Sequence, residues 1–405
     1  MRPISEIRED FPILQTSVHG RPLVYLDNGA TMQVPVQIMN AVSEQYTKYN
    51  ANIHRGVHYL SELSTSRVEN VRIKIAGFIG AEDPCEIIFT SGTTQGINMA
   101  AASMENTFIR KGDLIVTTEM EHHSNLIPWQ ELCRRTGARL GIIHVRPDGE
   151  LDQDEFEELL EYEPKLLALT CVSNVLGTVN PVKEIIEHAH AAGALVLLDA
   201  AQAMRHSRID VRELGCDFLC FSGHKIMAPA GTGVFYGKKE CLEKLRPAAF
   251  GGGMVDEVDL QSASYAELPF RFEAGTQNIA GIIGLGAAID YLESEDVDEI
   301  ASYEQHLLKY AETKLKEIPA VRILGNPKKR AGTLSFYIDG IHSYDIAKLL
   351  DAQGVAVRSG HHCAEPLLKA FGLENVVRIT PAFYNYKEEI EYAAACIERI
   401  LKLLR

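Results

Sequence analysis

Short apolar runs alternate with segments of helical periodicity between residues 85 and 240. The runs span 86–90, 113–118, 139–145, 165–172, 194–200, 218–222 and 233–237. Short apolar runs separated by helical segments are typical of strands that return to one sheet through crossover helices. The pattern therefore predicts an α/β fold with a mainly parallel, seven-stranded sheet.

The segments between these runs carry helix start and stop signals. In "NPVKEIIEHAHAAGA" (180–194), Asn180 can cap a helix, Pro181 suits its first turn and Gly193 can end it. This helix would have one apolar face, formed by Val182, Ile185, Ile186 and Ala189. The segment is therefore expected to form an amphipathic helix.

The pattern changes after about residue 280. Long helical segments extend to about 318, and strand-like runs follow at 321–324, 331–338, 355–359 and 376–380, with a helix near 343–353. This mixture predicts a smaller α+β lobe. A terminal helix from 387 is expected to pack on the sheet of that lobe through Ile390, Ala394, Ile397, Leu401 and Leu404.

The length of the chain also indicates two lobes. A single hydrophobic core stops growing at about 250–300 residues, and this chain has 405. We expect an N-terminal segment over 1–20, a large domain over 21–280 and a small domain over 281–405. The segment 249–278 is rich in Gly and polar residues and hardly periodic, as expected of a long functional loop.

Charge and composition exclude several classes of partner. The 55 acidic and 40 basic residues give a net charge of −15, which argues against nucleic acid or an anionic membrane. No apolar run reaches the ~18 residues of a membrane span, and the acidic N-terminus is unlike a signal peptide. Eight cysteines without a CxxC pair fit reduced thiols. We therefore expect a cytoplasmic protein. If its ligand is an anion, local hydrogen-bond donors must hold it, because the protein as a whole is negatively charged.

Residues just after the predicted strands are candidates for a ligand site, because ligands of open α/β sheets bind beyond the carboxyl ends of the strands. The run "FTSGTTQGIN" places Thr93 and Thr94 at a strand-to-helix junction, where free N–H groups and hydroxyls can hold a phosphate. A simple helix cap would use the same residue types. The spacing differs from that of a P-loop, which disfavours a nucleoside triphosphate.

Asp199 and Lys225 follow two successive predicted strands. A buried carboxylate such as Asp199 needs a partner, either in an internal ion pair or in the ring N–H of pyridoxal phosphate. Lys225 is either a solvated loop residue or an amine that can form a Schiff base. Because both strand ends can face one site, the pair indicates pyridoxal phosphate more specifically than either residue alone.

Longer motifs carry a family resemblance across nearly the whole chain. They are "YLDNGAT", "NIHRGVHYLS", "SGTTQGIN", "MEHHSNLIPWQ", "VSNVLGTVNP", "DAAQA", "FSGHK", "RFEAGTQN" and "RSGHHCAEP". With them the chain resembles the class V aminotransferase-like, fold-type I pyridoxal phosphate enzymes, and among these the Suf-type (group II) cysteine desulfurases. The pair "FSGHK" and "DAAQA" indicates the cofactor, and "RSGHHCA" indicates the desulfurase group.

The resemblance implies roles for individual residues. The implied catalytic residues are Lys225, which would hold the cofactor covalently, Cys363 and His122. The implied cofactor-binding residues are Asp199 at the pyridine nitrogen, Gln202 at the ring hydroxyl, His122 on the ring, and Thr93, Thr94, Ser222 and His224 at the phosphate, joined by Thr276 from the other subunit of a homodimer. The implied substrate-binding residues are Arg378, Asn174, Arg358, His54 and Arg55.

Three features depart from the pattern of the family. Asn28 and Gly29 replace a Ser-Ala pair, and Gln95 stands where an acid is common. The segment "TPAFYN" after Arg378 is also unusual. Asn28, Gly29 and Gln95 lie near the expected site, so they bear on substrate contacts and on coupling between subunits.

Cys363 is the cysteine with a chemical role. The basic neighbours Arg358, His361 and His362 would favour the thiolate, which is the reactive form. The resemblance implies that L-cysteine becomes L-alanine while Cys363 takes the sulfur as a persulfide for an acceptor protein of the Suf type. Its destination would be iron–sulfur cluster assembly rather than tRNA thiolation. The strand-to-cysteine tether spans under about 20 Å, so the acceptor is expected to dock near this loop.

Other functions share some of these features. Zinc binding by His361, His362 and Cys363 with His122 and His123 is disfavoured, because adjacent histidines of an extended segment point to opposite sides and no fourth ligand has suitable spacing. A selenocysteine lyase acting on L-selenocysteine, an aminotransferase or an epimerase could use the same scaffold. A non-enzymatic sulfur carrier is disfavoured by the presence of Lys225, Asp199 and Gln202 together.

Overall fold

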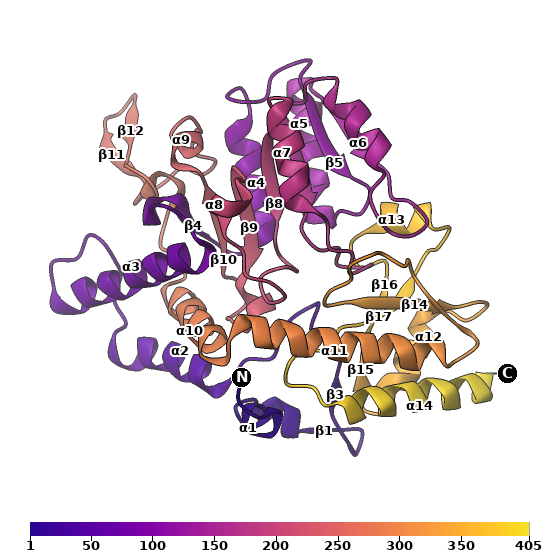
Figure 1. Cartoon of the computed structure of the whole chain (residues 1–405). Coiled ribbons are helices and arrows are strands. Elements are labelled where there is room, and N and C mark those ends of the chain that lie inside the picture. Colours follow the sequence, from indigo (N-terminus) through magenta and orange to yellow (C-terminus); the bar gives the residue numbers. More distant parts are fainter. Residues whose placement is uncertain (405) are drawn as a thin grey trace.

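The computed structural model describes residues 1–404. Its larger lobe contains a seven-stranded sheet with the order β4-β10-β9-β8-β7-β5-β6 (Figure 1). The strands are β4 (Ile87–Thr90), β5 (Leu114–Thr118), β6 (Arg139–Ile143), β7 (Leu166–Thr170), β8 (Leu195–Asp199), β9 (Phe218–Ser222) and β10 (Gly233–Gly237). Only β10 runs antiparallel to its neighbours in this sheet. The predicted mainly parallel sheet is confirmed, and each predicted run contains one strand.

Helices cover both faces of this sheet, which explains why its strands are apolar throughout. Leu198 belongs to the same hydrophobic cluster as buried residues of α3 (Tyr59–Ile79), α7 (Val182–Ala191) and α10 (Ile279–Glu295). Leu197, on the opposite face of β8, belongs to the cluster that contains buried residues of α4 (Thr93–Met104) and α5 (Ile127–Thr136). The other helical segments of this lobe are α1 (Ile4–Glu9), α2 (Val36–Lys48), α6 (Gln153–Leu160), α8 (Val211–Leu214), α9 (Lys239–Leu242), and the short η1 (Pro12–Gln15), η2 (Pro84–Glu86), η3 (His123–Asn125), η4 (Gly223–Ile226) and η5 (Phe270–Phe272).

The smaller lobe is the predicted α+β unit. Its antiparallel sheet has the order β13-β14-β17-β16. The strands are β13 (Val321–Ile323), β14 (Leu334–Ile338), β16 (Arg358–Gly360) and β17 (Val376–Ile379), and the helices are α11 (Val297–Lys316), α12 (Ser343–Asp351), α13 (Glu365–Ala370) and α14 (Lys387–Leu404).

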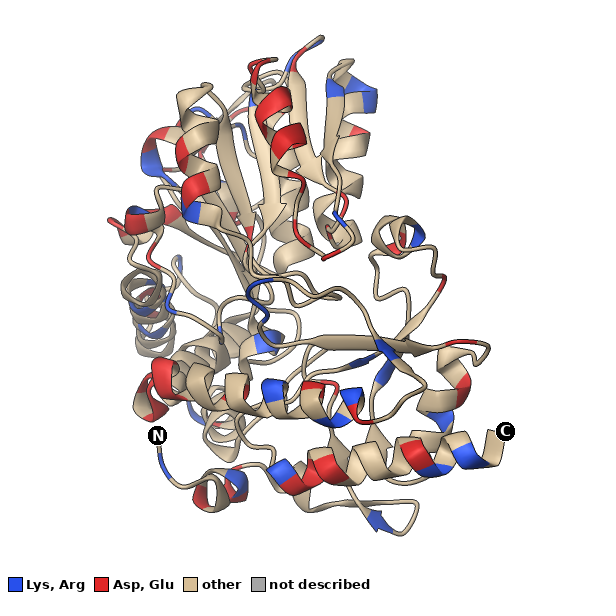
Figure 2. Cartoon of the chain, turned by 45° about the vertical axis from the view of Figure 1, so that its right-hand side comes forward, with Lys and Arg blue, Asp and Glu red and all other residues tan. Residues whose placement is uncertain are grey.

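The terminal helix α14 packs on this sheet as expected. Ile390, Ala394, Ile397 and Leu401 join the core of the lobe, whereas Leu404 is exposed, so its predicted core position is wrong. Leu404 lies in the last turn, beyond the apolar surface that the sheet offers. Charged residues of both signs lie along this helix, which ends at the C mark in Figure 2.

A short strand near the N-terminus joins the smaller lobe. β3 (Val24–Tyr25) pairs in parallel with β15 (Val355–Ala356), and Val24 and Leu26 belong to the hydrophobic core of the smaller lobe. Asp27 then bridges to Thr380 just after β17. The first strands, β1 (Ser17–Val18) and β2 (Arg21–Pro22), form a separate hairpin. Residues 29–32 then reach the ends of β8 and β9, where Gln202 Nε2 donates to Gly29 O (2.9 Å) and Met32 N–H donates to His224 O (3.0 Å).

Two local predictions are wrong. Asn180 does not cap α7, because its Nδ2 donates to Thr170 O (2.8 Å) and Pro181 takes the cap position without a side-chain bond. The long loop 249–278 contains an exposed hairpin of β11 (Val255–Val258) and β12 (Ala263–Tyr265), whose strands are too short and too polar to show a periodicity. Over residues 1–404, no helix has both the length and the apolar character of a transmembrane segment.

Candidate active site

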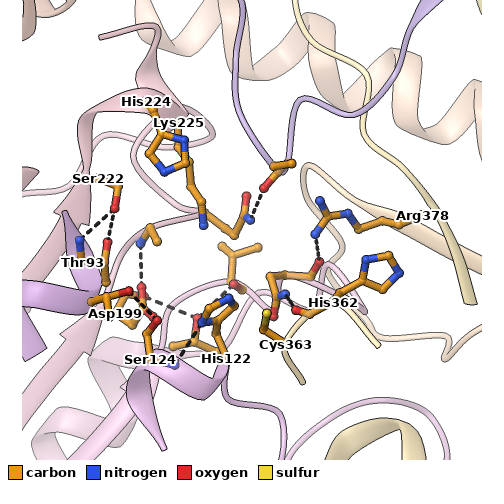
Figure 3. Close-up of a pocket in the computed structure, with 18 of the residues that line it drawn as sticks. Thr93, His122, Ser124, Asp199, Ser222, His224, Lys225, His362, Cys363 and Arg378 are labelled. Carbon is orange, nitrogen blue, oxygen red and sulfur yellow. Dashed lines mark hydrogen bonds between the residues drawn. The ribbon is translucent and has the colours of Figure 1, made fainter. Parts of the chain in front are cut away.

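The carboxyl ends of β7, β8 and β9 open into a cavity of about 200 Å³. Figure 3 shows Lys225, Asp199, His122 and Cys363 around this space. The cavity gathers these predicted site residues: Thr93, Thr94, His122, Asn174, Asp199, Gln202, Ser222, His224, Lys225, Arg358, Cys363 and Arg378. Strand ends from the larger lobe and loops from the smaller lobe therefore meet at one site.

The start of α4 forms one end of the cavity. Thr93 N–H donates to Ser222 Oγ (2.8 Å), and the hydroxyls of Thr93 and Ser222 also bond to each other (2.8 Å). Thr94 Oγ1 bonds to Ser124 Oγ (2.6 Å). Gly92, the N-cap residue, offers no side-chain acceptor to the first turn. Hydroxyls and the positive end of a helix thus face the same space, which suits a phosphate.

Asp199 and Lys225 lie at the floor of the cavity. Among the described residues, the one hydrogen bond to the Asp199 carboxylate comes from Ala201 N–H to Oδ1 (2.9 Å), so Oδ2 is available to a ligand. Burial raises the pKa of Asp199, and Lys225 opposes that shift. Burial lowers the pKa of Lys225 to about 8, against the attraction of Asp199, so a fraction of the amine is neutral at neutral pH.

These residues fit pyridoxal phosphate. The free carboxylate oxygen of Asp199 can accept the ring N–H, the amine of Lys225 can bind the aldehyde carbon, and the start of α4 can hold the phosphate. Gln202, the predicted partner of the ring hydroxyl, lies in the same cavity with its Nε2 donating to Gly29 O (2.9 Å). Asp199, Lys225 and the start of α4 thus match the ring nitrogen, the aldehyde and the phosphate of the cofactor.

His122 lies beside Lys225 and is neutral. Burial and then Lys225 lower its pKa to about 3. Its Nδ1 accepts from Ser124 N–H (3.0 Å), so the proton of the neutral ring is on Nε2. His224 is also neutral, with a pKa lowered to about 4 by burial. A neutral imidazole can stack on a cofactor ring without adding a charge that would compete with Asp199.

Two arginines stand opposite each other in the strand pair β16 and β17. The register pairs Arg358 with Arg378, and such a like-charge pair needs a counter-ion. Asp27 supplies it, since Arg378 Nη2 donates to its Oδ1 (3.3 Å) and Arg358 Nε to its Oδ2 (3.1 Å). Arg378 Nη1 also donates to Asn174 O (2.9 Å).

Arg378 and Asn174 keep polar atoms free in the cavity. Among the described residues, the buried Arg378 Nε and Asn174 Oδ1 have no hydrogen-bond partner. A buried polar atom without a partner costs free energy, so such atoms in a cavity mark a place for a ligand. Burial lowers the pKa of Arg378 to about 10, which still leaves it cationic at neutral pH. This corner of the site suits an anionic group such as a carboxylate.

Gly29 allows Arg378 to lie where it does. A Cβ at this position would stand 2.8 Å from Thr380 Oγ1 and 3.3 Å from the guanidinium carbon of Arg378. One of these side chains would have to move to make room for it. Gly29, one of the departures from the family pattern, therefore leaves the room that Thr380 and Arg378 occupy.

The cysteine loop has a strained backbone. His362 and Cys363 have φ angles of 52° and 55°, in the left-handed region that costs a residue with a Cβ roughly 1–2 kcal/mol. Asn174 Nδ2 donates to His362 O (2.8 Å), and His123 N–H donates to Cys363 O (2.7 Å). These contacts hold the strained turn against the floor of the cavity, while Cys363 as a residue is exposed.

The electrostatic prediction for this loop needs a correction. His362 is buried, and burial lowers its pKa to about 3, so it is neutral and supplies no positive charge to Cys363. Its neighbour Arg378 lowers the pKa further. Arg358, another predicted source of positive charge, is paired with Asp27.

Three predicted residues lie outside this cavity. Thr276, His54 and Arg55 line a second cavity of about 380 Å³, together with Gly252, Phe270 and Glu273. A single chain therefore does not bring them to Lys225. That Thr276 serves the other subunit of a dimer stays a prediction.

The unusual residues Asn28 and Tyr384 are partners. The buried Tyr384 hydroxyl donates to Asn28 Oδ1, and Asn28 Nδ2 donates to Thr380 O (2.8 Å). Asn385 completes the set, since its Oδ1 accepts from Asn28 Nδ2 (3.3 Å). Two departures that are far apart in the sequence thus form one buried network behind Arg378. Gln95 instead bonds locally, through its Oε1 to Ser91 N–H.

Sequence reasoning gave no role to several residues of the site. Asp27 pairs with both arginines, Ser124 bonds to Thr94, and Thr170 lines the cavity. Glu121 lies buried next to His122 and accepts from Thr118 Oγ1 (2.7 Å), Thr170 N–H (3.0 Å) and Asn125 Nδ2 (2.7 Å), so it holds β5, β7 and η3 together. Burial raises its pKa to about 8. Asp27 belongs to the motif "YLDNGAT" and Glu121 to "MEHHSNLIPWQ". Their place in these motifs is the sequence signal that could have indicated a role in the site.

Comparison with known proteins agrees with this geometry. Residues 24–393 match the model of the aminotransferase class-V family. The chain is 49% identical to a probable cysteine desulfurase of Halalkalibacterium halodurans, over 97% of each chain. It superposes on a cysteine desulfurase of Thermococcus onnurineus with a TM-score of 0.94, at 40% identity over 99% of each chain. For a cysteine desulfurase of Escherichia coli the TM-score is 0.92, at 35% identity over 100% of this chain and 99% of the other. The fold-type I architecture is thereby confirmed, and the chain belongs to the class-V aminotransferase family.

Proposed function

We propose that this chain is a pyridoxal phosphate-dependent cysteine desulfurase. It converts L-cysteine to L-alanine and takes the sulfur as a persulfide on Cys363. The observation that carries the proposal is that Lys225, Cys363 and Arg378 line one cavity. The similarity to cysteine desulfurases over the whole chain supports the same activity.

The chain's own residues would hold and tune the cofactor. Lys225 Nζ would bind its aldehyde carbon, Asp199 its ring nitrogen, and Thr93, Thr94, Ser222 and His224 its phosphate. When bound, pyridoxal phosphate withdraws electrons from the α-carbon of an amino acid substrate. Asp199 favours this withdrawal, because its negative charge keeps a proton on the ring nitrogen.

Arg378 and Asn174 would orient the substrate. The guanidinium is cationic at neutral pH, and its free Nε can donate to the carboxylate of L-cysteine. The lowered pKa of Lys225 lets its amine accept the α-proton and return a proton to the product. Arg378 is buried and Lys225 is half-buried at the wall of the cavity, and the low polarity around them strengthens these interactions.

Sulfur transfer needs no external oxidant. The Cys363 thiolate attacks the substrate sulfur, an S–S bond forms, and the C–S bond breaks. The electron pair of that bond and a proton end on the substrate carbon, which gives alanine. One L-cysteine and one thiol thus become one L-alanine and one persulfide. The strained turn at His362 and Cys363 keeps the thiol at the cavity during this step.

The test is to incubate the purified protein, with pyridoxal phosphate, in L-cysteine. We expect equimolar alanine and protein-bound sulfur in the first turnover, with the persulfide mapped to Cys363 by mass spectrometry. The same assay with L-selenocysteine and with other amino acids measures the preference among the related reactions. Pyruvate or a racemised amino acid in place of alanine would contradict the proposal.

Gly29→Ala is expected to raise KM for L-cysteine by about three- to tenfold, with a smaller change in kcat. The added Cβ would displace Thr380 or the Arg378 guanidinium, and a weakened ion pair of this kind costs on the order of 1 kcal/mol. Steady-state kinetics measure the change. Gly77→Ala is the control, since a Cβ there meets nothing within 4 Å and should leave KM unchanged. An unchanged KM in Gly29→Ala would show that Gly29 does not control the position of a substrate-binding Arg378.

We also propose that the protein works as a homodimer. Thr276, His54 and Arg55 line a cavity of their own, and exposed apolar side chains such as Val57, Tyr59, Phe250 and Leu260 lie in the neighbouring segments. Exposed apolar side chains gathered near a cavity favour an interface. In a dimer Thr276 would reach the phosphate of the partner's site. Light scattering should give a mass of about twice the 44.9 kDa of one chain.

The sulfur is proposed to leave through an acceptor protein that docks beside Cys363. Cys363 is exposed, yet its turn is fixed by Asn174 and His123, so the acceptor must approach the loop. By resemblance, the acceptor is of the Suf type and the destination is iron–sulfur cluster assembly. All eight cysteines are free thiols, which supports action in a reducing compartment such as the cytoplasm.

A further inference from the structure

The adjacent histidines of the motif "MEHHSN" face two different parts of the site. The His122 ring lines the cofactor cavity, whereas His123 contacts the cysteine loop from the smaller lobe. Its N–H donates to Cys363 O (2.7 Å), and its ring Nε2 accepts from Glu365 N–H (3.3 Å). His123 therefore holds the loop at the cysteine itself and again two residues later.

A second histidine extends this contact. The rings of His123 and His361 are stacked, with centroids 5.7 Å apart and planes inclined by 29°. His361 Nδ1 in turn accepts from Cys363 N–H (3.2 Å). Cys363 N–H is thus bonded to the ring of His361, and Cys363 C=O to the backbone N–H of His123, whose ring stacks on that of His361. A left-handed turn at two residues with side chains persists only where its surroundings fix it, and this pair is part of those surroundings.

The protonation state of His123 matches this role. Its Nε2 must be unprotonated to accept from Glu365 N–H, which places the proton of the ring on Nδ1. Burial and the neighbouring His361 lower the pKa of His123, while the carboxylate of Glu365 opposes the shift. At neutral pH the ring is therefore neutral and can act as the acceptor.

We propose that His123 is a positioning residue for Cys363. It joins the loop that carries His122 to the loop that carries the thiol, and so keeps the thiol within reach of a substrate held at Lys225. The inference rests on the proposed cysteine desulfurase activity. It predicts that loss of the His123 ring impairs sulfur transfer but not the binding of cofactor or substrate.

The test compares His123→Ala with His123→Gln, whose side-chain oxygen can replace Nε2 as acceptor. In His123→Ala we expect kcat for alanine formation to fall about tenfold, since a small displacement of a reacting group has effects of this size. KM for L-cysteine and the visible band of bound pyridoxal phosphate should stay unchanged. Alkylation of Cys363 by iodoacetamide, followed by peptide mass spectrometry, should be faster by about threefold or more, because the turn is released.

The controls separate this role from a general loss of structure. His123→Gln should recover most of kcat and the slow alkylation. His144→Ala removes an exposed histidine that is paired with Glu155 at the end of β6, and it should behave as the unmodified protein. An unchanged kcat and alkylation rate in His123→Ala would overturn the inference, as would a parallel loss of the visible band. If the unmodified protein forms no alanine, the proposed function itself fails.

Discussion

Lys225→Ala is expected to reduce alanine formation from L-cysteine at least about 1,000-fold, because the substitution removes both the covalent attachment of the cofactor and the base. The absorbance band of the lysine-bound cofactor near about 420 nm should vanish as well. Both changes follow from the position of the Lys225 amine, which lines the cavity close to Asp199. The measurements are an alanine assay and a visible spectrum of the purified variant.

Lys183→Ala is a matched control for this experiment. Lys183 is exposed on α7, and its substitution should change neither the spectrum nor the rate. A Lys225→Ala variant that keeps the absorbance band and the rate would show that the cofactor is bound elsewhere. The band of the unmodified protein also distinguishes the enzyme from a sulfur carrier that has kept only the fold. Such a carrier would bind no cofactor and would show no band even before the substitution.

Cys363→Ala is expected to abolish the mapped persulfide and to lower alanine formation about 100-fold, the scale of losing a catalytic nucleophile that a weaker external thiol partly replaces. The cofactor band and its change on adding L-cysteine should remain, because Lys225, Asp199 and Arg378 are untouched. The variant thus separates substrate binding from sulfur transfer. Cys363→Ser tests whether a smaller nucleophile at the same strained turn retains any transfer.

Cys85→Ser serves as the control cysteine. Cys85 is half-buried in η2, outside the residues that line the cavity, and its substitution should leave the persulfide on Cys363. If Cys363→Ala carried protein-bound sulfur at the unmodified rate, another thiol would be the acceptor and the proposed mechanism would fail.

The larger sheet could be predicted because its strands are buried on both faces. Each apolar run, such as that ending at Asp199, is bounded by polar or glycine residues, and the helices between the runs have their own periodicity. The hairpin at 255–265 could not be predicted in this way, because it is exposed and its residues follow no apolar pattern. The role of Asn180 depends on Thr170, ten residues away, which local cap signals do not include.

The residues of the site that could be predicted are those that lie at strand ends or in sequence motifs. Asp199 and Ser222 are the last residues of β8 and β9, and Lys225 lies three residues after β9, so topology alone brings them together. The ion pair between Asp27 and Arg378 could not be predicted from the sequence. It depends on the register of β16 and β17 and on the bridge between Asp27 and Thr380, which are 353 residues apart in the chain. His123 was considered only as a metal ligand, because its contact with Cys363 arises from tertiary packing.

The pairing of β3 with β15 has a consequence for how the protein is made. Val24 and Asp27 leave the ribosome early, yet their partners at Val355 and Thr380 are close to the end of the chain. At the usual 5–20 residues per second of synthesis, the early segment waits on the order of tens of seconds for them. The corner of the cavity around Asp27 and Arg378 is therefore assembled only as translation finishes, and a nascent chain stalled before Thr380 would be without it.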